Sequence, residues 1–306
     1  MNFDATAQTR FYFYTGIICV INNSIAIYLL IFKSGNIGTY RYYMLYFQIM
    51  CILLDIHLTL LVAPITYFPA LIAVSNGIYS KWFSIRTHFQ INMILSLIVL
   101  QICSLLCSFM RKHQSVAMID QKRIMDPVKK YLIKGFLHIP PILVCVSFAL
   151  SNLDKSEETK IAKEKFPYLL PLLILPNVEM YSDSSIPIIL TLIFMIFTFV
   201  LYCSLILYFY FQILYMLHGH RKFMAAKTYS KHISAMFSLV AQLFVLIVWL
   251  AIPVGLLLAD VILQVTGFEL IGNLLICLFS THSIVSTIVL VATFPAFRRI
   301  IFCQRK

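Results

Sequence analysis

Apolar residues gather in seven long runs along this chain, and polar residues gather between the runs. A helix rises about 1.5 Å per residue, so about 20 apolar residues cross the hydrocarbon core of a bilayer. Runs of that length predict an all-α membrane protein, a seven-transmembrane helix bundle in a single domain. The predicted helices are residues 11–32, 43–66, 89–110, 135–151, 186–217, 233–259 and 270–297, followed by a short basic amphipathic tail, 298–306.

Composition supports a membrane protein. Of the 306 residues, 61% are hydrophobic and 12% are charged, and the mean hydropathy is +0.89, whereas soluble domains average about 45–50% apolar and about 25% charged residues. A net charge of +12 would suggest a nucleic-acid partner in a soluble protein. In a membrane protein the location of the charges matters more than their sum, so we expect no nucleic-acid partner.

The charges also predict the orientation. Of the 24 Lys and Arg residues, 17 lie in the first, third and fifth loops and the tail, and 7 lie at the N-terminus and in the other loops. Because basic loops stay in the cytoplasm, we expect the N-terminus outside and the C-terminus in the cytoplasm. The fourth loop, residues 152–185, is either a surface helix followed by an apolar cap over the bundle or a solvated loop without a role.

Seven of the eight cysteines lie in apolar runs, and no Cys or His spacing is typical of a zinc site. We therefore expect no metal and no cofactor. The eighth, Cys303 in the tail, is either a palmitoylation site or a free thiol.

An aspartate, Asp55, lies at the centre of the second apolar run. A carboxylate at mid-membrane costs about 2.5–3.5 kcal/mol and rarely faces lipid. Helical rise brings polar residues of the first and seventh runs to the same depth, and we expect Asp55 to bond an asparagine of the first and a serine or histidine of the seventh. The cluster is either a two-state switch or simple packing between helices. The candidates are Asn22, Asn23, His282, Ser283 and Ser286.

Polar and aromatic residues near the outer ends of the helices form a second group. Such a mixture describes a small-molecule pocket in the mouth of a bundle, and equally the aromatic belt at a lipid interface. The candidates for ligand binding are His88, Gln90, Asn92, Trp249 and Asn273.

The third and fifth loops are basic and partly amphipathic. They either dock a heterotrimeric G protein or meet anionic lipid. The candidates for facing a G protein are Arg111, Lys112, Arg221, Lys222 and Arg298.

Enzyme and transporter classes fit the sequence less well. An intramembrane aspartyl protease needs two facing aspartates, whereas Asp55 is the only acid well inside the predicted runs, and a GxSG motif is absent. We therefore expect that the protein is not an enzyme. A ligand-gated channel or a proton-coupled transporter that uses Asp55 is the alternative, although the paired broken helices typical of carriers are not visible.

Three passages carry a resemblance. They are RYYMLYFQIMCILLD (residues 41–55), RKHQS (111–115) and HSIVSTIVLVATFPAFR (282–298). The first is similar to the second-helix signature of the nematode serpentine chemoreceptors, class I (sri) first and the related class H (srh) second. The others resemble that family's motif at the inner end of helix three and its seventh-helix ending, and the resemblance runs across the whole chain.

The resemblance implies a G-protein-coupled receptor for a small-molecule cue, on the cilia of chemosensory (olfactory) neurons. Arg111 would then occupy the place of the switch arginine of rhodopsin-like receptors, although Met110 precedes it instead of aspartate. The family's proline-tyrosine-arginine ending is here Ala296–Phe297–Arg298. The disulfide common in rhodopsin-like receptors, between the top of helix three and the fourth loop, cannot form, since neither place has a cysteine.

Overall fold

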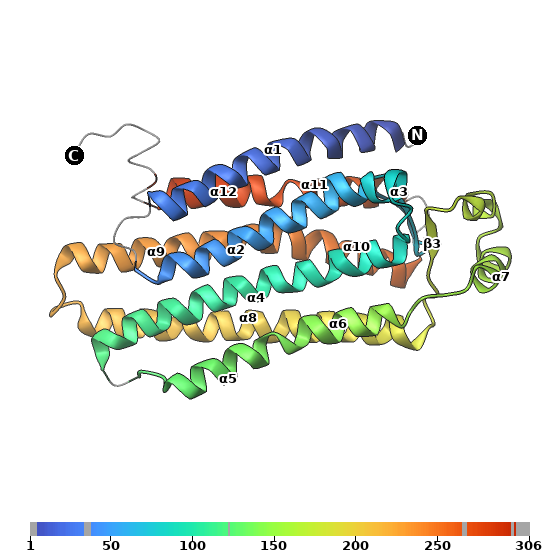
Figure 1. Cartoon of the computed structure of the whole chain (residues 1–306). Coiled ribbons are helices and arrows are strands. Elements are labelled where there is room, and N and C mark those ends of the chain that lie inside the picture. Colours follow the sequence, from blue (N-terminus) through green and yellow to red (C-terminus); the bar gives the residue numbers. More distant parts are fainter. Residues whose placement is uncertain (1–4, 34–37, 122, 265–267, 295–296, 298–306) are drawn as a thin grey trace.

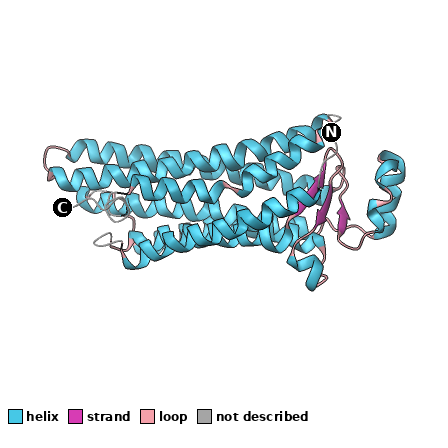
Figure 2. Cartoon of the chain, turned by 90° about the horizontal axis from the view of Figure 1, so that it is seen from above, coloured by secondary structure: helices cyan, strands magenta, loops and turns pink. Residues whose placement is uncertain are grey.

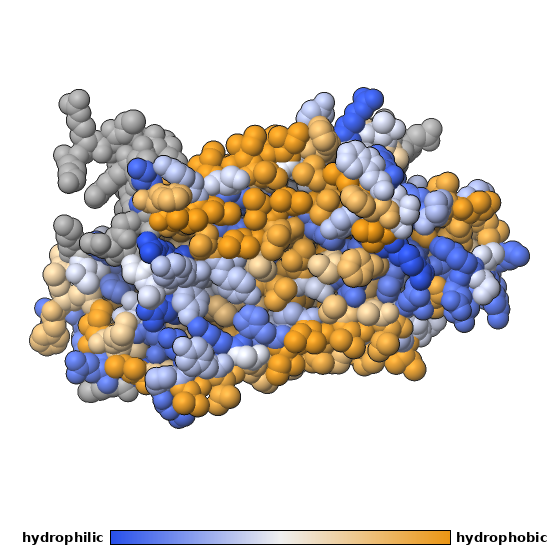
Figure 3. Space-filling view, viewed as in Figure 1, coloured by the Kyte–Doolittle hydropathy of each residue, from blue (hydrophilic) through white to orange (hydrophobic). Residues whose placement is uncertain are grey.

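The computed structural model is a bundle of long helices with a small sheet at one end (Figure 1, Figure 2). It describes residues 5–33, 38–121, 123–264, 268–294 and 297, with the side chains of residues 120 and 227 excepted. Within these residues, seven helices are long and apolar enough to cross a membrane. Figure 3 shows hydrophobic residues gathered over the middle of the visible face, with hydrophilic residues more frequent toward the two ends. This distribution fits a bundle whose middle lies in lipid.

Some of the seven spans are continuous and others are divided. The spans are α1 (Ala5–Phe32); α2 (Tyr40–Asp55) with the π-helical turn η1 (Ile56–Val62); α4 (Thr87–Asp120); α5 (Pro127–Leu137) with α6 (Ile139–Ala149); α8 (Ile186–His220); α9 (Ala226–Leu246) with the π-helical turn η4 (Ile247–Ala251) and α10 (Ile252–Leu263); and α11 (Glu269–Ser280) with α12 (His282–Thr293).

Prolines coincide with two of the divisions. Pro140 and Pro141 follow the junction of α5 and α6, and Pro253 follows η4. Proline has no N–H, so a carbonyl one turn earlier loses its helical partner and the helix kinks or widens there.

Several helix ends differ from the predicted bounds. The second span ends at Val62 and not at Thr66, because Ala63 adopts a left-handed φ of 45° and a strand follows. The third, fourth and sixth spans extend beyond their apolar runs, since backbone hydrogen bonds continue a helix into polar sequence. The sixth runs to Leu263, which places a second buried acid, Asp260, inside a helix. The predicted tail, 298–306, lies outside the described residues.

α4 is the central helix of the bundle. Of its most apolar stretch, 78% is buried, against 22–50% in the other six spans. It packs against α2, α6, α8 and α9, and its Leu, Ile, Cys and Phe side chains contribute to the main hydrophobic core. A displacement of α4 therefore affects most of the other helices.

A three-stranded antiparallel sheet covers one end of the bundle (Figure 2). β1 (Pro64–Tyr67) pairs with β2 (Ile72–Ser75), and β2 pairs with β3 (Val178–Met180), so that Pro64 lies opposite Ser75 and Ile72 lies opposite Met180. The short helices near this sheet are α3 (Ile78–Trp82), α7 (Lys155–Lys165), η2 (Pro167–Leu169) and η3 (Leu172–Ile174). We call residues 64–75 and 155–180 the lid, and this end of the bundle the lid end.

A tight return of the chain fixes the lid to the second span. The N–H of Gly77 donates to the carbonyl of Val62 at 2.8 Å. A Cβ at residue 77 would collide with the carbonyl oxygen of Leu61, so the close approach requires glycine.

The lid has a hydrophobic cluster of its own. The fourth loop therefore forms a short helix followed by an apolar cap, the first of the two predicted forms. The cluster consists of Ile65, Ala70, Ile72, Val74, Ala162, Leu169, Leu173, Val178 and Met180.

Two buried carboxylates lie close together inside the lid. Glu158 of α7 is fully buried and pairs with Lys155 at 2.8 Å. Glu179 of β3 is also buried and pairs with Arg86 at 3.2 Å. Burial raises the pKa of Glu158 to about 7; Lys155 opposes this shift and Glu179 adds to it.

Acidification should therefore stabilise the folded lid. An ordinary glutamate has a pKa near 4.5. Glu158 therefore binds its proton more tightly in the folded lid than in the locally unfolded lid. The stability from this proton is fully present below about pH 4.5 and is lost as pH rises through about 7. Hydrogen–deuterium exchange of residues 155–180, corrected for the intrinsic pH dependence of exchange, should show stronger protection at about pH 5 than at about pH 8.

Two variants provide the control. Glu158→Gln should remove this pH dependence, whereas Glu157→Gln, on the exposed face of the same helix, should keep it. Equal pH dependence in both variants would show that Glu158 is not the titrating group.

Candidate functional site

Asp55 is fully buried at the end of α2, directly before the π-helical turn. Nδ2 of Asn23 in α1 donates to Oδ2 of Asp55 at 2.8 Å, and the Ser283 hydroxyl of α12 donates to the same oxygen. Asn23 Nδ2 also lies 3.0 Å from the Ser283 hydroxyl. The structure thus brings together polar residues of the first, second and seventh spans, which helical rise places at one depth.

The second carboxylate oxygen of Asp55 faces His282. Nδ1 of His282 lies 3.7 Å from Oδ1 of Asp55 and 3.0 Å from the carbonyl oxygen of Phe279. The Gln101 amide of α4 donates to Nε2 of His282 at 2.8 Å, so the imidazole is neutral and its hydrogen is on Nδ1. Within the described residues, Oδ1 of Asp55 has no hydrogen-bond partner.

The Nδ1–H of His282 therefore has two acceptors close to it. It donates to Phe279 in this structure, and a shift of about 1 Å would instead bring it within hydrogen-bond distance of Asp55. A bond to the carboxylate would be charge-assisted and stronger, but it would leave the Phe279 carbonyl without this donor. Such a pair of arrangements is what a two-state element requires.

Three further residues belong to this cluster and were not predicted. Gln48 of α2 donates to Asn23 and, at 2.9 Å, to the Thr287 hydroxyl, and Gln101 joins α4 to His282. The sequence did contain a signal, because Gln48 lies about two helical turns before Asp55 on the same face, and Gln101 is the only amide side chain between Met93 and Met110.

Two predicted members lie at the margin of the cluster. Asn22 is half-buried and donates to the carbonyl of Ile284 at 3.3 Å. Ser286 is buried, but its hydroxyl has no hydrogen-bond partner in the described part of the chain.

Two of the residues predicted to bind ligand instead hold the lid. Gln90 of α4 accepts from the Ser75 hydroxyl at 2.6 Å and donates to the carbonyl of Ile85 at 2.7 Å. Asn273 of α11 donates to the carbonyl of Thr66 at 2.8 Å and accepts from the N–H of Thr66 at 3.1 Å. These two amides fasten β2 and β1, respectively, to the bundle.

The other three predicted residues lie in separate places. His88 stacks on Phe148 and lies 3.3 Å from the Tyr181 hydroxyl. Asn92 donates to the carbonyl of Cys145 at 3.1 Å and so joins α4 to α6. Trp249 is half-buried in η4. The structure does not bring the five candidates into one pocket.

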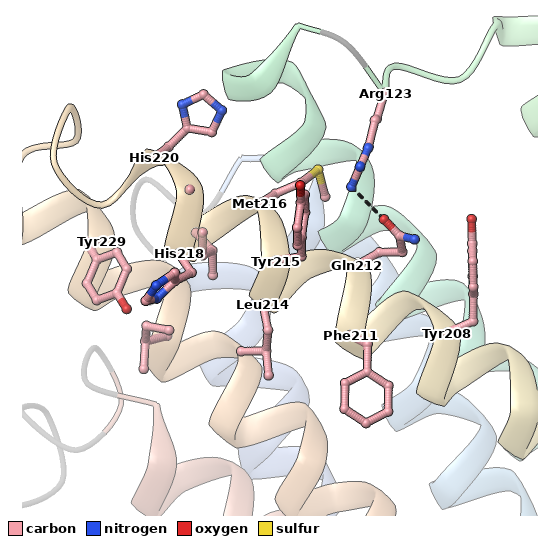
Figure 4. A pocket seen from close by; sticks show the side chains of 13 residues that line it. Arg123, Tyr208, Phe211, Gln212, Leu214, Tyr215, Met216, His218, His220 and Tyr229 are labelled. Atoms are coloured by element: carbon pink, nitrogen blue, oxygen red, sulfur yellow. Dashed lines mark hydrogen bonds between the residues drawn. The ribbon is translucent and has the colours of Figure 1, made fainter.

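A hollow of about 1160 Å³ opens at the end of the bundle opposite the lid. Its walls come from the end of α8, the start of α9 and the connection between α4 and α5 (Figure 4). Arg123 reaches into it, donates to Gln212 at 2.7 Å and lies over the Tyr215 ring at 4.8 Å. His218, Tyr229 and several aliphatic side chains also line it, so the wall combines one guanidinium with histidine, aromatic and aliphatic side chains.

None of the described basic residues that were predicted to face a G protein lines this hollow. Arg111 donates to Thr39, and Lys112 is buried with Nζ 5.5 Å from the centre of the Tyr40 ring. Arg221 and Lys222 are exposed just beyond α8. Arg298 lies outside the described residues. The hollow was not predicted, because it depends on how α8 and α9 are spaced.

Comparisons with known proteins agree with this architecture. A family model described as serpentine type 7TM GPCR chemoreceptor Sri matches residues 6–301. The crystal structure of squid rhodopsin superposes with a TM-score of 0.65 at 13% identity, over 99% of this chain and 88% of the rhodopsin chain. At this identity the likeness shows the fold, a seven-helix bundle. No curated protein matches the chain.

The polar cluster can be tested with adjacent asparagines. Asn23→Ala removes one of the two donors to Asp55 and should destabilise the protein by about 1–3 kcal/mol. Asn22→Ala removes one bond at a half-buried position and should cost about 0.6 kcal/mol. The measurement is the fraction of detergent-solubilised protein that stays monodisperse after heating. Equal losses in both variants would contradict the assigned cluster.

Proposed function

The chain belongs to the Sri family of serpentine seven-transmembrane G-protein-coupled chemoreceptors, and from this premise we propose that it detects a small-molecule environmental cue and activates a heterotrimeric G protein. The family match over residues 6–301 is the observation that carries the proposal. Membership of this family disfavours an assignment as an enzyme, a channel or a transporter.

The proposed orientation has the lid end outside and the hollow in the cytoplasm. The distribution of basic residues supports it, because 17 of the 24 Lys and Arg residues are in the loops and tail assigned to the cytoplasm. The proposed location is the plasma membrane of a chemosensory neuron, on its sensory cilium, as the resemblance to the nematode serpentine chemoreceptors implies.

The hollow is the proposed docking place for the G protein. A helix has a diameter of about 10 Å, so a hollow of this volume has room for about two turns of a helix. Arg123, His218 and Tyr229 line it, and Arg221 and Lys222 lie nearby. Such a wall suits an amphipathic segment that carries acidic side chains.

The cluster around Asp55 is the proposed switch, and hydrogen bonds connect it to the hollow. His282 and Ser283 begin α12, and Thr293 ends it. The Thr293 hydroxyl donates to the Ser238 hydroxyl of α9 at 2.8 Å, and the Ser234 hydroxyl donates to the carbonyl of Thr293 at 3.1 Å. A shift of α12 at His282 would thus move α9, whose first turns form one wall of the hollow.

The receptor assignment predicts that cue-evoked signals require a G protein. We expect that cells expressing the full chain and a Gα subunit respond to a member of a panel of volatile and water-soluble cues in a second-messenger assay. Asp55→Asn should abolish the response while surface expression is retained. A cue-evoked current that persists in cells without the G protein would contradict the assignment and support a channel.

If the G protein docks in the hollow, a reversal of charge in the wall of the hollow should lower G-protein activation. Arg123→Glu places an acid in the hollow and should lower G-protein activation by at least about five-fold at equal surface expression. Lys129→Glu, an exposed position nearby outside the hollow, makes the same change in charge and should have little effect. Equal losses from the two variants would point to general charge repulsion and not to docking in the hollow.

A further inference from the structure

A second cavity lies between α4, α8 and the η4–α10 segment. Its volume is about 230 Å³, and of the residues that line it Thr198 alone has a polar side chain. The inner wall is formed by buried residues such as Ile98, Ile102 and Leu250. In the described part of the chain the Thr198 hydroxyl makes no hydrogen bond, so it is available to a molecule in the cavity.

The cavity opens sideways, toward the lipid. At its rim Ile196 is 55% exposed and Gly255 is also exposed. A Cβ added at Gly255 would meet no atom within 4 Å, so the glycine leaves an opening between α8 and α10. Both helices belong to spans that are long and apolar enough to cross a membrane, so an exposed apolar rim between them would face hydrocarbon.

In the described part of the chain, the lid end of the bundle carries amide groups that are already bonded. The lid covers it, and the amides of Gln90 and Asn273 are occupied in fastening the lid to α4 and α11. A strongly polar cue would need such groups for recognition. The apolar cavity with one hydroxyl suits a different class of molecule.

We propose that this cavity binds a small, uncharged, lipid-soluble molecule with one hydrogen-bond-accepting oxygen, such as a ketone or ester, which enters from the bilayer between α8 and α10. The inference rests on the proposed receptor function and names its ligand class. A cavity of about 150 Å³ accommodates benzene, so this larger one takes a molecule of about ten non-hydrogen atoms. The Thr198 hydroxyl donates to the oxygen of the ligand, and the remaining contacts are apolar.

The position of the cavity connects ligand binding with the proposed switch around Asp55. Ile98 and Ile102 of α4 lie on either side of Gln101 in sequence, and Gln101 donates to His282. The opposite wall contains the π-helical turn η4, which is followed by Pro253. A π-helical turn inside an α-helix often marks a functional site, and a ligand between these two walls contacts both this turn and the residues beside Gln101.

Photoaffinity labelling tests the site directly. The full chain in lipid nanodiscs is irradiated with a small methyl ketone that carries an aliphatic diazirine and has about nine non-hydrogen atoms, and labelled peptides are located by mass spectrometry with and without excess acetophenone. We expect label on residues 195–199 and 250–258 that acetophenone reduces by at least about five-fold. Label that acetophenone does not displace would mean that a lipid chain occupies the cavity, and it would overturn the proposal.

Matched variants sharpen the test. Gly255→Leu should fill the opening and abolish the displaceable label, whereas Gly135→Leu, also a helical glycine with open space around it but outside the cavity, should retain it. Thr198→Val keeps the shape of the side chain and should weaken competition by acetophenone about five-fold, through the loss of one hydrogen bond. Displaceable label that is unchanged in both Gly255→Leu and Thr198→Val would overturn the proposal.

This labelling uses no G protein, so it separates the ligand site from the receptor function. Displaceable label without activation by any cue would support the cavity and count against the receptor assignment. Cue-evoked activation that is unchanged in Gly255→Leu would support the receptor and overturn the cavity as its ligand site.

Discussion

A carboxylate at the middle of a membrane must find partners inside the protein, and the rest of this structure depends on how Asp55 meets that requirement. One of its oxygens accepts from Asn23 and Ser283, which joins α1, α2 and α12. The other faces His282, and His282 is bonded to Gln101 of the central helix. Four of the seven spans are therefore connected by one small polar cluster, in surroundings where each lost bond leaves a polar group without water.

The hydrogen bonds of this cluster connect several helices, but they do not satisfy every polar atom in it. Oδ1 of Asp55 has no hydrogen-bond partner among the described residues, and the Nδ1–H of His282 is near two acceptors. A fully satisfied cluster would favour one arrangement strongly, because every alternative would break bonds in a low-dielectric interior. Here the second arrangement exchanges one acceptor for another, so the change costs less free energy than the loss of a hydrogen bond without replacement would. That property suits the proposed switch.

The sequence predicted the parts of the structure that follow from local rules. Apolar run length predicted the seven spans, and helical rise predicted that Asp55 would bond an asparagine of the first span and a serine or histidine of the seventh. The structure identifies these partners as Asn23 and Ser283. The helix and apolar cap of the fourth loop were one of its two predicted forms, but the sheet of the lid was not predicted, because its strands join residues 64–75 to residues 178–180, and β1 continued the second apolar run. For the same reason Gln90 and Asn273 were interpreted as ligand candidates, since their partners in the lid are distant in sequence. The cavity around Thr198 has no sequence signal, because ordinary core residues line it.

Both hollow spaces lie along one seam of the bundle, between α8 and the α9–α10 span. α8 packs mainly against α4 and α6, while α9 packs mainly against α12 and η4, so changes in the spacing of this seam disturb few other contacts. In the proposed scheme a ligand fills the seam near the middle of the membrane and a G protein fills it at the cytoplasmic end. If both favour the same spacing, each must raise the affinity of the other by the same factor, because coupling between two binding sites is reciprocal. The seam then transmits the signal, and the cluster around Asp55 sets the free-energy difference between its two states.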